Sequence, residues 1–123
     1  MTEADIKAFI KEYEKATNSH DFEKLKPLID SKATYWFTDG SFKGHKEIGN
    51  AIKGTWNKIR NEKYRIQKIQ IIFLESKSSG IKYEFLWEGM VRGKVQKGSG
   101  RGTNIITKNQ SGKLQVVHEH LSK

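Results

Sequence analysis

The chain has 123 residues, a formal net charge of +9 and no cysteine. It is therefore the size of one typical domain, residues 1–123, and it has neither disulfides nor thiolate metal ligands. Only four of its 23 basic residues are arginines, and the lysines are scattered along the chain and interleaved with glutamates. This scatter favours a solvated surface over a nucleic-acid-binding stripe, so nucleic acid is not an expected partner.

The N-terminal segment predicts a helix followed by a break and a second, short helix. Apolar residues recur at three- and four-residue intervals from Ile6 to Ala16, which indicates an amphipathic helix. Thr2, with Asp5 three residues later, has the spacing of an N-cap pair. Residues 18–21 break the helix and can cap the next one, where the chain's single proline is tolerated only near the start.

The next segments predict a strand and a third helix. Residues 33–38 are β-branched and aromatic and are followed by an Asp-Gly turn signal, which indicates a strand. Apolar residues at helical spacing then mark an amphipathic helix from His45 or Lys46 to about Arg60.

From Tyr64 onward the whole chain is typical of strand. Residues 64–77 and 81–95 predict one hairpin, and residues 98–108 and 113–122 predict another. Helices followed by a long antiparallel meander make an α+β layout, in which the helices lie on one side of the sheet.

Two features of the sequence bear on where in the cell the protein is found: its apolar runs and its first residues. No apolar run approaches membrane-spanning length, and the acidic start lacks the basic and apolar regions of a signal peptide. We therefore expect a cytoplasmic protein without a membrane partner.

Several stretches resemble the nuclear-transport-factor-2-like superfamily along nearly the whole chain. Residues 13–34 resemble its entry of two helices and a strand, and residues 42–48 resemble its entry to the third helix. Residues 100–104 and 111–122 resemble the "R-x-T … G-K-W … V-H-x-H-x-S" ending of SnoaL-like domains and of the calcium/calmodulin-dependent kinase II association domain, with Leu114 in place of Trp. The resemblance implies a dimeric, cystatin-like cone: three N-terminal helices packed on a curved antiparallel sheet that encloses a pocket.

The superfamily includes ketosteroid isomerase, and its catalytic positions can be compared one at a time. The resemblance places its two oxyanion donors at Tyr13 and Asn104. Its general-base position falls at or near Phe37, which cannot accept a proton, and Asp39 would replace it only in a shifted strand. Glu88 and Glu119 are the other candidates for a catalytic base, because carboxylates that share an apolar cavity raise one another's pKa.

Strand alternation and the resemblance to the kinase association domain together predict which side chains face the pocket. Val117 is among the residues expected to face inward. The full predicted pocket, including its aromatic walls, consists of Tyr13, Trp36, Trp56, Glu84, Leu86, Glu88, Asn104, Ile106, Glu119 and Leu121.

The opposite set of strand residues is too aromatic for solvent and fits a sheet-to-sheet dimer interface. This predicted interface consists of Phe85, Trp87, Thr103, Ile105, His118 and His120. The two histidines share a face, as metal ligands can, but the spacing supplies no third ligand, so no metal site is expected. Gly98, Gly100 and Gly102 do not form a phosphate loop because no helix follows them. No cofactor is expected.

Three functions follow, in order of preference. The first is a homodimeric module that binds a small, mainly apolar ligand. The second is an isomerase, dehydratase or hydrolase that uses acid–base chemistry in the cone. The third is an association domain, for which the pocket is incidental.

Overall fold

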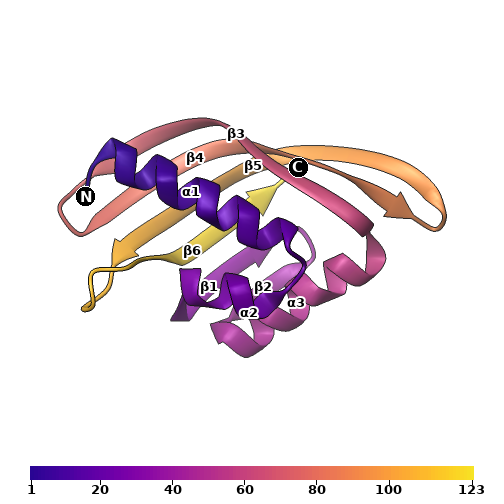
Figure 1. Ribbon diagram of the computed structural model, residues 1–123, viewed down its shortest axis with the longest axis horizontal. Coiled ribbons are helices and arrows are strands. Elements are labelled where there is room, and N and C mark those ends of the chain that lie inside the picture. Colours follow the sequence, from indigo (N-terminus) through magenta and orange to yellow (C-terminus); the bar gives the residue numbers. More distant parts are fainter.

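The computed structural model describes all residues, 1–123, and shows helices packed on one strongly curved sheet (Figure 1). The helical segments, in chain order, are α1 (Glu3–Asn18), α2 (Phe22–Leu25), the 3₁₀ turn η1 (Lys26–Leu28) and α3 (Gly44–Lys58). The strands are β1 (Ile29–Phe37), β2 (Gly40–Lys43), β3 (Arg60–Leu74), β4 (Ser78–Val91), β5 (Lys94–Lys108) and β6 (Leu114–Ser122).

The six strands form one sheet in the order β2-β1-β6-β5-β4-β3. Every neighbouring pair is antiparallel except β1 and β6, which are parallel. The α+β cone predicted from the sequence is confirmed, but the sheet is mixed rather than purely antiparallel. The parallel pair arises because β6 returns across the sheet and joins the edge of β1, which the chain formed before α3.

Helix α1 lies across the concave face of the sheet, and its inner side is the predicted one (Figure 1). Its buried residues are Ile6, Phe9, Ile10, Tyr13 and Ala16. The side chain of Thr2 accepts a hydrogen bond from the Asp5 backbone, and the Asp5 carboxylate accepts one from the Thr2 backbone, which completes a capping box. Local sequence therefore fixes both the start of α1 and the face that it buries.

The turn between β4 and β5 differs from the prediction. The sequence predicts a strand to Val95, whereas the structure turns at Arg92 and Gly93, whose φ angles are 53° and 78°. Two successive positive φ angles are typical of a two-residue hairpin turn. An Arg-Gly pair is a weaker signal for that turn than Asn-Gly, which is why the sequence did not reveal it. The resulting hairpin extends past the end of α3 (Figure 1).

Candidate functional site

A cavity of about 540 Å³ lies between the helices and the concave face of the sheet. All three helices and every strand except β2 contribute to its lining. Two features define its chemistry: two buried carboxylates, those of Glu62 and Glu119, and a largely aromatic wall. The aromatic wall consists of Phe37, Trp56, Tyr64, Phe85 and Trp87, and Tyr13 adds its hydroxyl. The volume and the mainly apolar lining are those of a small-molecule site.

Three glycines on β5 make room for the aromatic side chains of β4. Gly98 pairs with Trp87 and Gly100 with Phe85 across the strands. A Cβ atom at either glycine would collide with the ring opposite. The alternating glycines are therefore the structural reason why large rings fit on the inner face, and they are a sequence signal that our reading did not use.

The inner and outer faces of β4 are the reverse of the prediction. Phe85 and Trp87 line the cavity, although they were expected at a dimer interface. The alternate residues Glu84, Leu86 and Glu88 consequently face outward, although they were expected in the pocket. Glu88 pairs with Lys97 at 3.7 Å, and Glu84 pairs with Lys68 at 3.5 Å. Glu88 therefore does not lie where a base in the cone would have to lie.

On strands β1 and β6, individual side chains also point in directions that differ from the prediction. Trp36, expected in the pocket, is 49% exposed on the outer face, because the buried Tyr35 takes the inward position beside it. On β6 an irregularity in the pairing with β5 turns Val116 into the core in place of Val117. Ile106 is fully buried but is not among the residues that line the cavity. Tyr13, Trp56, Glu119 and Leu121 line the cavity.

Glu119 lies at the centre of a buried hydrogen-bond network. Its Oε1 accepts from the Tyr13 hydroxyl at 3.1 Å and from Asn104 Nδ2 at 3.2 Å, and the Tyr83 hydroxyl lies 3.5 Å away. The Tyr13 hydroxyl lies 2.6 Å from that of Tyr35, and Tyr83 donates to Asn104 Oδ1 at 2.8 Å. Two donors therefore hold the side chain of Glu119, and Tyr83 orients one of them, Asn104.

The same contacts leave the other oxygen of Glu119 for the cavity. All of its side-chain hydrogen bonds are to Oε1. No buried side-chain oxygen or nitrogen lacks a partner, so Oε2 is accessible and faces the cavity that Glu119 lines. Burial raises the pKa of Glu119 to about 7, while the hydrogen bonds from Asn104, Tyr13 and Tyr83 oppose that rise. A carboxylate with this pKa can both take and give a proton near neutral pH.

Tyr13 and Asn104 donate to Glu119 and not to a substrate position. The resemblance to ketosteroid isomerase implied that both would stabilise an oxyanion. In the structure their hydrogen bonds converge on a carboxylate that is itself the candidate base. This arrangement makes them residues that position Glu119. Burial and the negative charge of Glu119 raise the pKa of Tyr13 well above its usual value, so its hydroxyl remains protonated and able to donate.

Glu62 is the site residue that sequence reasoning missed. It lies at the start of β3, is 8% exposed and lines the cavity. Burial raises the pKa of its carboxyl to about 7. Burial, and after it the negative charges of Glu119 and Glu62, raise the pKa of Tyr64, which also lines the cavity. Asp39 lies at the same cavity but is exposed.

The outer face of the sheet carries four of the residues predicted at the interface: Thr103, Ile105, His118 and His120. The rings of both histidines contact Trp36, with centroids 4.9 and 5.6 Å apart. The Nδ1 of His118 lies 2.8 Å from the hydroxyl of Thr34. No group of three or more histidine or acidic side chains is arranged to hold a metal ion.

No helix has the length and apolar character needed to cross a membrane. No protein-family model and no curated protein matches the chain. Solved structures do match the chain, and three of them illustrate the kinds of protein that share its fold.

A nuclear-transport-factor-2-like superfamily protein from Salmonella enterica is 18% identical, with a TM-score of 0.86 over 95% of this chain and 87% of that one. The association domain of the calcium/calmodulin-dependent kinase II of C. elegans is 18% identical, with a TM-score of 0.81 over 98% and 95%. A candidate scytalone dehydratase from Novosphingobium aromaticivorans is 14% identical, with a TM-score of 0.81 over 94% and 79%. At these identities the similarity confirms the nuclear-transport-factor-2-like, cystatin-like fold that the sequence resembles. The structures that share this fold include both a candidate enzyme and an association domain.

Proposed function

We propose that the protein is an enzyme that binds a compact, mainly apolar molecule in the cone and moves a proton on it with Glu119. The observation that carries this proposal is the geometry of Glu119: Oε1 is held by the donors Tyr13 and Asn104, and Oε2 faces an aromatic cavity. Retention of a ligand without chemistry, which the sequence ranks first, needs no such carboxylate. We therefore rank catalysis above ligand binding without chemistry as the function of the cavity.

The reaction class follows from the properties of one accessible carboxylate oxygen. Ionised Glu119 removes a proton from a carbon next to an electron-withdrawing group, and the protonated form returns it to another atom or to a departing hydroxyl. The first outcome is an isomerisation and the second a dehydration. A solved structure of similar fold carries the name of a candidate scytalone dehydratase, which supports the second class as one to test.

A generic substrate for proton abstraction tests the proposal without knowledge of the natural one. With 5-nitrobenzisoxazole, a carboxylate removes the proton on C3, the N–O bond breaks, and the oxygen leaves as a coloured phenolate. We expect turnover to rise with pH and to level off above about 7, as Glu119 ionises. Glu119→Gln should lower the rate about 100-fold or more.

The control variant is Glu84→Gln, which removes the same charge from the outer face of the sheet. It should leave the rate unchanged. A wild-type rate no higher than that of free acetate, or equal rates for the wild type and Glu119→Gln, would show that Glu119 is not a working base.

A second candidate function, self-association, rests on the outer face. Trp36 is 49% exposed between His118 and His120 on that face, and an exposed tryptophan in such a setting favours a partner surface. One of the similar structures is an association domain. We therefore expect a homodimer through this face, and Trp36→Glu should convert it to a monomer in sedimentation experiments. A wild-type monomer would contradict this expectation.

A further inference from the structure

Glu62 is directed into the cone by an irregularity at the start of β3. The pairing of β3 with β4 shifts register between Arg60 and Lys63, and Asn61 has a φ of 55°. Such a bulge redirects the side chain that follows it. Gly89 on β4 permits the close approach, because a Cβ there would lie 3.2 Å from Glu62 Cα and 3.0 Å from the Arg60 carbonyl. The inward position of Glu62 is therefore built by three unusual backbone features.

The backbone of Glu62 is held, while its carboxylate has no partner. His20 donates through Nε2 to the Glu62 carbonyl at 3.0 Å, and its ring stacks on Trp56 with centroids 5.3 Å apart. The ion pairs of the protein involve other glutamates, and the side-chain hydrogen bonds include none to the Glu62 carboxylate. Glu62 is 8% exposed as a whole residue, and because no buried side-chain oxygen lacks a partner, its unpaired carboxylate oxygens are accessible from the cavity that it lines. A carboxylate in so buried a residue without a partner in the protein is unusual.

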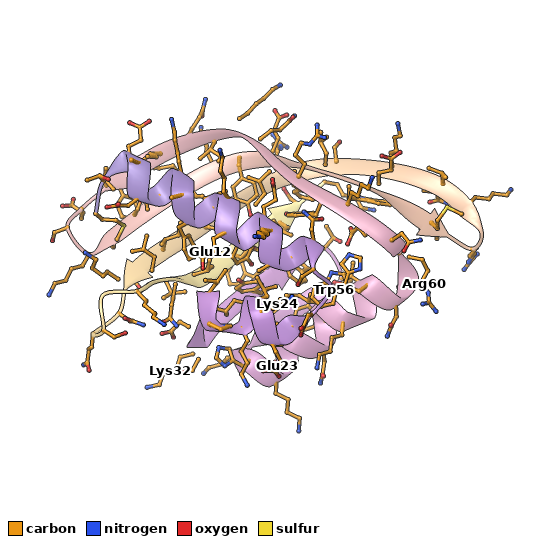
Figure 2. All side chains as sticks on the ribbon, viewed as in Figure 1. Glu12, Glu23, Lys24, Lys32, Trp56 and Arg60 are labelled. Atoms are coloured by element: carbon orange, nitrogen blue, oxygen red, sulfur yellow. The ribbon has the colours of Figure 1, made fainter.

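The neighbouring cations do not compensate this charge. Arg60, two residues away, projects away from the body of the protein beyond Trp56 (Figure 2). Lys97 lines the cavity, but its amine pairs with Glu88 on the other side of the sheet. Lys123, the last residue, also lines the cavity and has no ion pair to Glu62. The cavity therefore contains an acidic group without a protein counter-ion.

The surroundings of Glu62 fit an organic cation better than a metal ion. A metal ion needs several oxygen or nitrogen ligands, and no cluster of three suitable residues includes Glu62. Aromatic rings attract ammonium groups through their faces. Trp56, Tyr64 and Trp87 line the same cavity. A carboxylate beside aromatic rings is the combination that recognises an ammonium group on an apolar body.

We infer that Glu62 and the aromatic wall bind the ammonium group of a compact amine, whose apolar body fills the cavity and reaches Glu119. This inference rests on the proposed function, because it names the class of molecule on which Glu119 acts. Glu62 is the anchor, and Glu119 remains the group that moves a proton.

The test compares tryptamine with tryptophol, which have the same ring and linker but end in an ammonium and a hydroxyl group. Calorimetry at pH 8 keeps both Glu62 and tryptamine charged. We expect the wild type to bind tryptamine at least tenfold more tightly than tryptophol. Glu62→Gln should reduce this ratio to about one while tryptophol affinity stays within threefold, which also shows that the variant is folded. The matched control, Glu84→Gln, should keep the wild-type ratio.

Three results would overturn the inference: no tryptamine binding by the wild type at millimolar concentration, equal affinity for the two probes, or an unchanged preference in Glu62→Gln. Loss of the preference in Glu119→Gln and not in Glu62→Gln would also overturn it, because the amine would then pair with Glu119. Turnover of 5-nitrobenzisoxazole depends on Glu119 and needs no ammonium group, so it fails only if the proposed function fails.

Discussion

Glu119→Gln should gain stability relative to the wild type as the pH rises from 5 to 8, although it removes the proposed base. The folded-state pKa of Glu119 is about 7, against an ordinary value of 4.5. A raised folded pKa means that the folded state resists ionisation. The free energy of unfolding of the wild type therefore falls as pH rises from about 4.5 to 7 and stays low above that range. Glutamine keeps the shape of the side chain but does not titrate.

The size of the effect follows from the two pKa values. One pH unit of difference corresponds to about 1.4 kcal/mol. Between pH 5 and pH 8 the ionisation of Glu119 should therefore lower wild-type stability by about 2–3 kcal/mol relative to Glu119→Gln. The two donors to Oε1, Tyr13 and Asn104, can remain bonded to the amide oxygen of the glutamine, which places its NH₂ group toward the cavity.

Urea denaturation followed by tryptophan fluorescence measures this difference at both pH values. Subtracting the variant–wild-type difference at pH 5 from that at pH 8 removes contributions that do not titrate. Glu84→Gln is the control, and its difference should not change by this amount. A Glu119→Gln difference that is independent of pH, or that favours the variant more at pH 5, would refute the raised pKa.

Two further predictions concern the groups around the cavity. Tyr13→Phe removes a donor to the ionised form of Glu119, so the midpoint of the pH–rate profile should move upward by roughly one pH unit; an unchanged midpoint would mean that the Tyr13 hydroxyl does not stabilise the charge. Gly100→Ala puts a Cβ against the Phe85 ring and the Ser122 carbonyl and should destabilise the fold by about 1–3 kcal/mol in chemical denaturation. Wild-type stability in that variant would show that the ring does not pack there.

The helices and the ending of the chain could be predicted because their signals are local. The inner face of α1 follows from helical spacing, and its start follows from the Thr2–Asp5 pair. The resemblance predicts that Asn104 and Glu119 both face the pocket, and in the structure the two strands pair at those residues. These features can be predicted without knowing which other elements pack against them.

The faces of β4 could not be assigned from alternation, because both faces carry apolar residues. Phe85 lies inside and Leu86 lies outside, so hydrophobicity does not decide between them. The inward face of β4 is decided by tertiary packing, because the glycines of β5 leave room for aromatic rings on one face only. The sequence could not identify Glu62 as a cavity residue for a similar reason. Its inward direction depends on a bulge that Gly89, far along the chain, allows to form.

The most direct test of the central claim is the titration of Glu119 itself. Carbon-13 NMR of the protein labelled at the glutamate side-chain carboxyl reports each carboxylate as pH changes. Glu119→Gln and Glu62→Gln identify the two signals of the cavity by their disappearance. We predict a Glu119 signal with a midpoint near pH 7, which would establish a carboxylate ready to exchange protons inside the cone. A midpoint near 4.5 would mean a permanently ionised group and would contradict the proposed chemistry.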